Sequence, residues 1–313
     1  MKRFLRISPI LVLVPVLLFF YVRYTETAQG NAEENPSQDS IGIKWKKFSG
    51  GRDGKLIYAN PPDLFVLYLK TGNLNRIDGI RVDGGKGRWN RGKTPRPFWS
   101  PDGSFFVYRY SGRIYMADEK GKKKAVVNER MDTSNETRWS IVNLRGVDYI
   151  FGPSKDKTGI AVSINDPSVV LELFPYPVID KHCELTADAG YLVYSTNSEI
   201  YIADLSVNSE GIKISHGQNC RPCASPRSYA AWLPAPHLKY NIHDIRTGKL
   251  YKELKAPVNE EIYRLNWSND EEFAVHMFGS RGNTRIHIRK ISSGESFFAG
   301  TGWDPDLWIG PVQ

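Results

Sequence analysis

The side chains best suited to bind a metal or form a disulfide in this 313-residue chain are its three cysteines and the histidines near them. Cys220 and Cys223 form a Cys-x-x-Cys pair after His216, and Cys183 directly follows His182. A closed Cys/His zinc site usually has a second tight ligand pair, and here only His182 and Cys183 are available. We therefore favour one disulfide, from Cys183 to Cys220 or Cys223, over unpaired buried thiols and over a metal. No metal site and no cofactor is predicted.

No other set of residues has the spacing of a catalytic centre. His276 and His287 lie in strand-like runs, which favours positions on a strand face over a role as ligands. Acidic pairs such as Glu271 and Glu272 fall between such runs, in expected turns. The chain also lacks the Gly-x-Ser-x-Gly motif of the hydrolase nucleophile. The sequence thus nominates no catalytic residue.

The elements that would position any site are short aromatic hairpins. The clearest one consists of an aromatic strand end, a four-residue turn and a strand at Phe105–Tyr108. In that turn proline presets φ at the second position, aspartate can accept hydrogen bonds from nearby backbone N–H groups, and glycine accepts a positive φ. Trp99 ends the first strand of this hairpin. The turn that follows consists of Ser100, Pro101, Asp102 and Gly103.

Degraded copies of this hairpin recur at intervals of roughly 35 to 50 residues, the range of four-stranded propeller blades. The copies lie near residues 49, 100, 153, 187, 225 and 268, and a fragment lies near residue 304. Apolar and polar residues alternate within them as in β-strands, and no amphipathic helix is expected after residue 40. We predict an all-β fold, a β-propeller with six blades, with seven blades as the alternative. The fragment would supply a closing strand beside an N-terminal strand at Ile41–Phe48.

The repeat resembles that of a known family. A Trp-Ser-Pro-Asp-Gly turn, an aromatic strand and the pattern Ile-Tyr-x-x-Asp, present at Ile114–Asp118 and Ile200–Asp204, are similar to the repeat of TolB-type β-propellers and of the propeller in prolyl oligopeptidases. The resemblance extends over roughly residues 43–308, although Arg227 stands where the aspartate is expected and Asn269 replaces the proline. It implies an extracytoplasmic binding or scaffolding module and nothing narrower.

Residues 1–30 have the composition of an export signal. Three basic side chains precede the apolar run Ile7–Val22, which is short for a bilayer span but suits the core of a signal peptide. Arg23 after the run would also suit a retained membrane anchor. In both cases the propeller is expected outside the cytoplasm, periplasmic or secreted, with membrane contact only through this segment. Residues 31–40 are predicted to be a flexible linker and residues 41–313 the propeller.

The charge of the chain is modestly basic. The formal net charge is +8, and four basic side chains and one acid in residues 1–30 leave +5 on the remainder. Because export is expected and no nucleic-acid-binding motif is present, we predict no nucleic-acid partner. The long expected loop Gly72–Thr94 contains a basic, glycine-rich stretch with a tryptophan. The partner-binding residues predicted there are Lys86, Arg88, Trp89 and Arg91.

These features predict a monomeric, non-enzymatic propeller that binds a protein or an envelope polymer through its loops. The prediction rests on repeats that are rich in fold-specifying residues and contain no catalytic spacing. The alternative is a propeller enzyme, a lyase or glycoside-active protein, that acts on an acidic polysaccharide. A deep pocket at one mouth of the channel, holding several carboxylates or histidines with shifted pKa values, would favour the enzyme.

Overall fold

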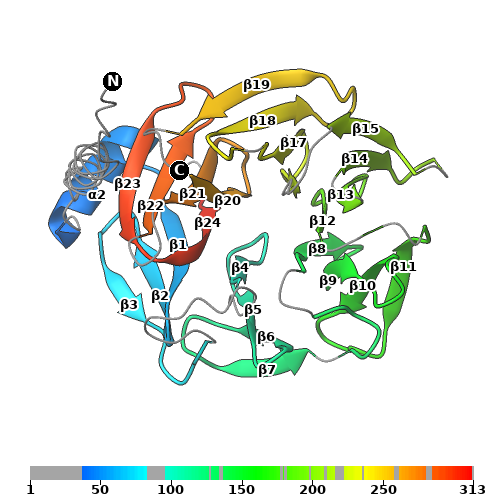
Figure 1. Ribbon diagram of the computed structural model, residues 1–313. Coiled ribbons are helices and arrows are strands. Elements are labelled where there is room, and N and C mark those ends of the chain that lie inside the picture. The colour runs from blue at the N-terminus through cyan, green and yellow to red at the C-terminus, as the bar shows by residue number, and fades with distance from the viewer. Residues whose placement is uncertain are drawn as a thin grey trace, which may run out of the picture. The chain divides into compact units, whose positions relative to one another are not determined.

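The computed structural model shows six four-stranded antiparallel sheets arranged as blades around a central axis (Figure 1). The predicted all-β fold, a β-propeller with six blades, is therefore confirmed. The residues described are 37–82, 96–126, 128–133, 137–176, 179, 182–196, 199–207, 210–215, 222–234, 236–256, 261–279 and 284–311.

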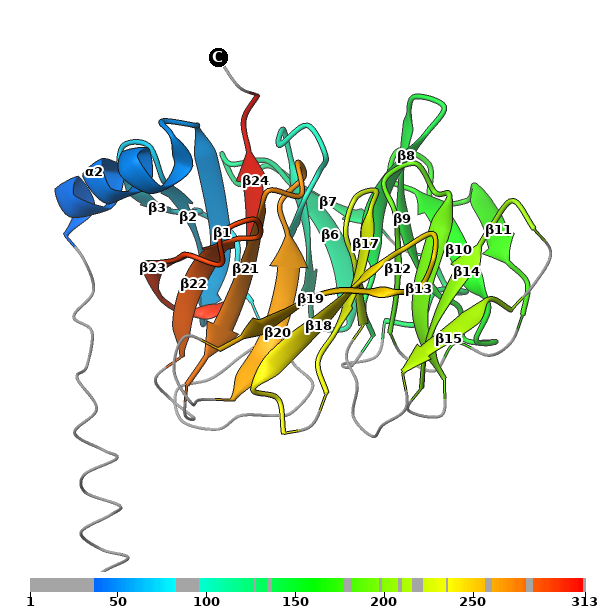
Figure 2. The ribbon, with the colours of Figure 1, turned by 90° about the horizontal axis from the view of Figure 1, so that it is seen from above.

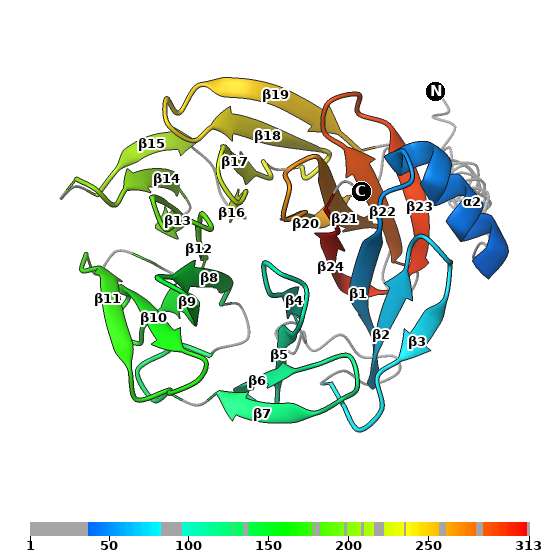
Figure 3. The same ribbon diagram turned by 180° about the vertical axis from the view of Figure 1, so that it is seen from behind.

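Each blade places its first strand nearest the axis and its fourth at the rim (Figures 1 and 3). Blade 1 contains β24 (Trp303–Ile309), β1 (Gly54–Asn60), β2 (Asp63–Tyr68) and β3 (Leu74–Arg76). Blade 2 contains β4 (Phe98–Trp99), β5 (Phe106–Tyr110), β6 (Arg113–Ala117) and β7 (Lys123–Val126). Blade 3 contains β8 (Ser140–Leu144), β9 (Val147–Pro153), β10 (Gly159–Ser163) and β11 (Val170–Phe174).

The remaining three blades follow in chain order around the ring. Blade 4 contains β12 (Cys183–Leu185), β13 (Tyr191–Thr196), β14 (Glu199–Asp204) and β15 (Ile212–Ser215). Blade 5 contains β16 (Pro222–Ala224), β17 (Tyr229–Trp232), β18 (Lys239–Asp244) and β19 (Leu250–Lys255). Blade 6 contains β20 (Ile262–Trp267), β21 (Phe273–Phe278), β22 (Arg285–Lys290) and β23 (Ser296–Thr301).

The last strand of the chain closes the ring. β24 is the inner strand of blade 1 and pairs antiparallel with β1, in a register that sets Gly54 opposite Ile309 and Leu56 opposite Leu307. Backbone hydrogen bonds therefore join the two ends of the propeller, and β1 is paired on both of its edges. The terminal fragment was predicted to supply a closing strand, which is right, but its partner is β1 and not the segment Ile41–Phe48.

The expected strand at Ile41–Phe48 is instead part of a helix, α2 (Gln38–Ser49), so the prediction of no helix after residue 40 is also wrong. Ile41 and Trp45 are buried, whereas Ile43 is 74 % exposed, so burial follows the helical period and not the alternation read from the sequence. The helix ends at Gly50, whose φ of 76° suits a left-handed C-cap. Within the described residues, no helix has the length and apolar character needed to cross a membrane.

The prediction that a repeat begins at the turn near residue 153 is wrong by one hairpin. The turn that joins the first and second strands of blade 3 lies between Leu144 and Val147, whereas Ser154–Thr158 joins the second and third. The error has a local cause. The Ser154 hydroxyl accepts the backbone N–H of Thr158, just as the hydroxyl of Ser100 accepts that of Phe105 in the best copy. The two turns therefore share a chemistry that does not distinguish their place in a blade.

Six apolar clusters form the core of the described residues, one at each interface between neighbouring blades. Trp99 packs between blades 1 and 2, and Trp267 packs between blades 5 and 6. At the closure, Trp45 of α2 joins the cluster between blades 6 and 1. A single sheet cannot bury both of its faces, so each blade depends on its two neighbours.

Candidate functional site

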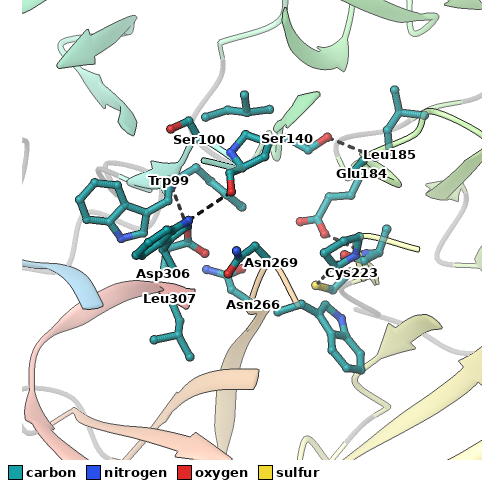
Figure 4. A pocket seen from close by; sticks show the side chains of 18 of the residues that line it. Trp99, Ser100, Ser140, Glu184, Leu185, Cys223, Asn266, Asn269, Asp306 and Leu307 are labelled. Carbon is teal, nitrogen blue, oxygen red and sulfur yellow. Dashed lines mark hydrogen bonds between the residues drawn. The ribbon is translucent and has the colours of Figure 1, made fainter. Parts of the chain in front are cut away.

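A pocket of about 270 Å³ opens where the six inner strands converge at one mouth of the channel (Figure 4). We call this side the turn face, because turns between first and second strands supply Pro101, Ala187, Arg227 and Asn269 to the lining. β24 runs toward this side of the molecule (Figure 2). The polar side chains in the lining include Ser140, Glu184, Asn266, Asn269 and Asp306.

Asp306 is a buried carboxyl group in the pocket wall, 5 % exposed. Its Oδ2 accepts the backbone N–H of Trp99 at 2.8 Å, which joins the inner strands of blades 1 and 2. Burial raises the pKa of Asp306 to about 7, and the hydrogen bond from Trp99 offsets only part of this effect. The group is therefore poised between its neutral and ionised forms near neutral pH.

Glu184, the second carboxyl group of the pocket, forms an ion pair with Arg138. Arg138 Nε lies 2.7 Å from Glu184 Oε1, and both side chains are buried. Burial alone would lower the pKa of Arg138, but the carboxylate of Glu184, together with smaller contributions from Cys223 and Tyr240, raises it. Glu184 Oε2 also accepts the backbone N–H of Ala224 at 2.9 Å, so this carboxylate links blades 4 and 5.

Arg138 spans the channel beneath the pocket. It precedes β8 of blade 3, and its Nη1 donates to the carbonyl oxygen of Pro222 in blade 5 at 2.7 Å. Its Nη2 donates to the carbonyl oxygen of Leu265 at 3.2 Å and to Asn266 Oδ1 at 2.9 Å in blade 6. Because Arg138 also pairs with Glu184 of blade 4, its side chain contacts three blades besides its own.

A second buried ion pair lies between blades 6 and 1. Arg264 Nη1 is 3.0 Å from Asp304 Oδ1, and Asn266 donates to the carbonyl oxygen of Pro305 at 2.6 Å. Burial by itself would raise the pKa of Asp304, but the charges and hydrogen bonds of Arg264 and Arg96 together lower it. Polar contacts thus supplement the apolar packing between the inner strands, and the charges involved are paired where they are buried.

The residues predicted to bind a partner, Lys86, Arg88, Trp89 and Arg91, belong to the connection between β3 and β4 and lie outside the described residues. Of the predicted turn residues, Trp99, Ser100 and Pro101 line the pocket; Asp102 and Gly103 complete the turn beside it.

The predicted disulfide is not formed between Cys183 and Cys223, which are free, buried thiols. Cys183 packs in the core between blades 3 and 4 and Cys223 in the core between blades 5 and 6, so the two side chains serve different interfaces. Burial raises the pKa of both thiols well above the usual value. Cys220 and His216 lie outside the described residues. Elsewhere in the described part of the chain, no cluster of three His, Cys, Asp or Glu side chains could hold a metal.

The sequence did not point to the residues that define the pocket. Glu184, Asn266 and Asp306 come from three different repeats, and Arg138, which pairs with Glu184, lies before the first strand of blade 3. One signal was available: Asp304 and Asp306 flank Pro305 in the terminal fragment, where two acids in an otherwise apolar strand are unusual.

Comparisons with known proteins support the fold. No protein-family model matches the chain, and no curated protein is similar to it in sequence. Among solved structures, TolB from Acinetobacter baumannii matches with a TM-score of 0.52 and 15% identity, over 85% of this chain and 70% of that one. A chain of a nidogen/laminin complex matches with a TM-score of 0.57 and 10% identity, over 83% and 99%. At these identities the likeness concerns the fold: the chain is a six-bladed β-propeller of the kind seen in TolB.

Proposed function

We propose that this chain is a non-enzymatic, protein-binding propeller that holds a segment of its partner in the turn-face pocket. The observation that carries the proposal is the convergence of residues from all six inner strands on one open pocket. Propellers of similar fold include a chain from a complex of nidogen with laminin, an assembly of two proteins. A mouth built from every blade is the place where a rigid ring can present the largest number of different side chains to one ligand.

The size of the pocket limits what it can hold. Its volume of about 270 Å³ is below the roughly 300–1,000 Å³ of sites for whole small molecules. It therefore suits one side chain or one chain end of a larger partner, while the rim makes the remaining contacts. The rim offers the exposed Pro101 and Arg227 and the half-buried Trp308, and arginine and tryptophan are residue types that often anchor protein interfaces.

The test fills the pocket without changing the core. Ala187 lies in a turn at the pocket and is only half-buried, so Ala187→Trp should cover the mouth. Ala125→Trp is the matched control, because Ala125 is exposed on β7 and does not line the pocket. Affinity capture from extracts of the source cells should recover a partner with the wild type and with the control, and lose it with Ala187→Trp. Equal recovery by all three proteins would contradict the proposal.

We also propose that the propeller works outside the cytoplasm, periplasmic or secreted. The support is the apolar run Ile7–Val22 with basic residues before it. Intact cells, and cells with a permeabilised outer envelope, should be treated with a protease that does not enter the cytoplasm. Degradation of the full-length chain, with a cytoplasmic marker left intact, is the expected result. Complete protection, with an extracytoplasmic marker degraded, would reject this location.

The second candidate function is an enzyme acting on an acidic polysaccharide. One observation favours it: Glu184 and Asp306 line the same pocket, and the pKa of Asp306 is raised to about 7, as for a general acid. We rank it second because each carboxyl group already accepts a backbone N–H from the neighbouring blade, which accounts for its position. Release of reducing or unsaturated ends from uronic-acid polymers, abolished by Asp306→Asn, would reverse this order.

A further inference from the structure

We propose that the turn-face pocket receives an ammonium group of the partner, with the carboxylate of Asp306 as its main acceptor. This inference rests on the proposed function, because it names the chemistry by which that pocket would recognise a polypeptide. The ammonium could belong to a lysine side chain or to an amino terminus. Both have the same charge and the same three N–H donors.

Asp306 forms no ion pair among the described residues, although the charge of Arg264 acts on it and offsets part of the rise in its pKa. Of the buried guanidinium groups in the channel, Arg138 is paired with Glu184 and Arg264 with Asp304. Asp306 receives backbone N–H groups, and no ion pair joins it to a described cation. A buried carboxylate without an ion-pair partner is unfavourable, and an arriving ammonium would supply that partner.

The wall around Asp306 is rich in oxygen atoms that can accept hydrogen bonds. Asn266, Asn269 and Ser140 add amide and hydroxyl oxygens to the lining, and the carboxylate of Glu184 lies across the pocket (Figure 4). The basic residue of the lining, Arg227, belongs to an exposed turn at the rim. Ammonium needs several oxygen acceptors at once, and a pocket this small can bring them together around one such group.

The protonation of Asp306 should make binding of an ammonium group depend on pH. Because burial holds the pKa of Asp306 near 7, the acceptor is fully ionised only above neutral pH. A ligand that needs the ionised form binds with an apparent affinity scaled by the ionised fraction. Binding of a lysine side chain should therefore strengthen by roughly tenfold between about pH 6 and about pH 8. A terminal ammonium, whose ordinary pKa is about 8, should instead show a maximum between these values.

The experiment uses three matched probes and the full propeller. Nα-acetyl-lysine-N-methylamide carries a side-chain ammonium, leucine-N-methylamide carries a terminal one, and Nα-acetyl-norleucine-N-methylamide has the size of the lysine probe without its charge. Ligand-observed NMR titrations at several pH values give the dissociation constants. We expect one ammonium probe to bind at least about tenfold more tightly than the norleucine probe, with the pH dependence given above. Which one binds identifies the source of the group.

Two variants test the acceptor. Asp306→Asn keeps an oxygen that can accept the Trp99 N–H but removes the charge. It should weaken binding of the ammonium probe at least about tenfold and abolish the pH dependence of that binding. Asp204→Asn removes the same charge from the end of β14 in blade 4, which does not line the pocket, and should leave binding of the ammonium probe unchanged. Equal binding of all three probes, binding by none of them, or binding unchanged in Asp306→Asn would overturn the inference. If Ala187→Trp still abolished partner capture, the proposed function would survive that failure.

Discussion

The indole nitrogen of Trp308 donates a hydrogen bond of 3.1 Å to the carbonyl oxygen of Pro101. The contact joins the last strand of the chain to the Ser-Pro-Asp-Gly turn of blade 2. Gly103 of the same turn, with a φ of 70°, lies so close to the ring that a Cβ there would be 2.5 Å from Trp308 Cε2. The turn that identified the repeat is therefore also fitted to the strand that closes the ring.

Replacing Gly103 with alanine should destabilise the propeller through both its backbone conformation and this contact. The positive φ alone costs about 1 kcal/mol for alanine, and displacing the indole adds a clash that local adjustment cannot fully relieve. Gly112→Ala is the matched control, because its φ is 73° and no atom lies within 4 Å of its Cβ position. Urea denaturation should show the larger loss for Gly103→Ala. Equal losses would mean that Trp308 moves aside freely.

The recurring hairpins allowed the fold to be predicted, because turn chemistry and strand alternation are local properties. Ser100, Thr186, Ser225 and Ser268 each cap the same kind of turn by accepting a backbone N–H of the strand that follows. The phase of blade 3 was wrong because Ser154 makes that pattern at a different turn. Local chemistry thus gives the number of repeats more securely than the position of each turn within its blade.

The helix and the pocket could not be predicted for a different reason. Ile41, Ile43 and Trp45 alternate as in a strand, and only packing against blades 1 and 6 shows that Ile43 faces outward. In the pocket, Glu184 and Asp306 are separated along the chain by the length of three blades, and they face the same space only because the inner strands of the ring converge. Such convergence is a property of the assembled propeller, and no single repeat carries a sign of it.

Arg138→Met should be strongly destabilising, because it leaves the carboxylate of Glu184 buried without its cation. Breaking a buried pair in this way costs about 3–5 kcal/mol. Removing Glu184 as well, in an Arg138→Met, Glu184→Gln double variant, should recover part of the loss. Lys213→Met breaks the 2.6 Å pair with Glu199 near the surface, which contributes at most about 1 kcal/mol. Similar unfolding free energies for Arg138→Met and this control would show that Arg138 does not support the channel.

Acid should destabilise the fold through two stacked histidines of blade 6. His276 and His287 are buried with ring centroids 6.2 Å apart, and burial lowers the pKa of His276 well below 6.5 and that of His287 to about 3. A lowered histidine pKa means that the unfolded chain takes up protons first. Stability is therefore complete above about pH 6.5 and falls as the pH drops toward 3, by about 1.4 kcal/mol per pH unit for each histidine.

The variant His276→Leu should flatten this acid limb, because one of the two groups no longer titrates. In the wild type, the Nε2 of His276 has no hydrogen-bond partner among the described residues, so the replacement removes an unsatisfied polar atom from the core. Thermal unfolding of both proteins between about pH 4 and about pH 7 measures the effect. Parallel curves for wild type and variant would exclude His276 as a source of the acid sensitivity.

The contribution of Asp306 to stability should change with pH in the direction opposite to that of the two histidines. Its pKa rises from 3.8 to about 7 on folding, so the folded chain binds the proton more tightly than the unfolded chain does. This contribution is fully present below pH 3.8 and is lost as the pH rises through about 7. Asp306→Asn should therefore be more stable than wild type at about pH 8 and gain little at about pH 4. A variant that is less stable at both values would indicate that the ionised carboxylate supports the fold.

Trp45 of helix α2 should contribute strongly to the closure of the ring. Its indole is fully buried, its ring centroid lies 5.6 Å from those of Phe273 and Phe297 in blade 6, and its Nε1 donates to the carbonyl oxygen of Arg52 at 2.7 Å. Trp45→Ala should therefore cost about 3–5 kcal/mol, as for a large residue removed from a core.

The matched control is Ile43→Ala on the same helix, which should change stability by less than about 0.5 kcal/mol because Ile43 is mostly exposed. Equilibrium urea unfolding of both variants gives the comparison, and the slope with denaturant shows whether the transition stays cooperative. If the closure is the weakest interface, Trp45→Ala should also speed proteolysis within blade 1 relative to blade 4. Losses of equal size in the two variants would mean that α2 rests on the propeller without stabilising the junction of β24 with β1.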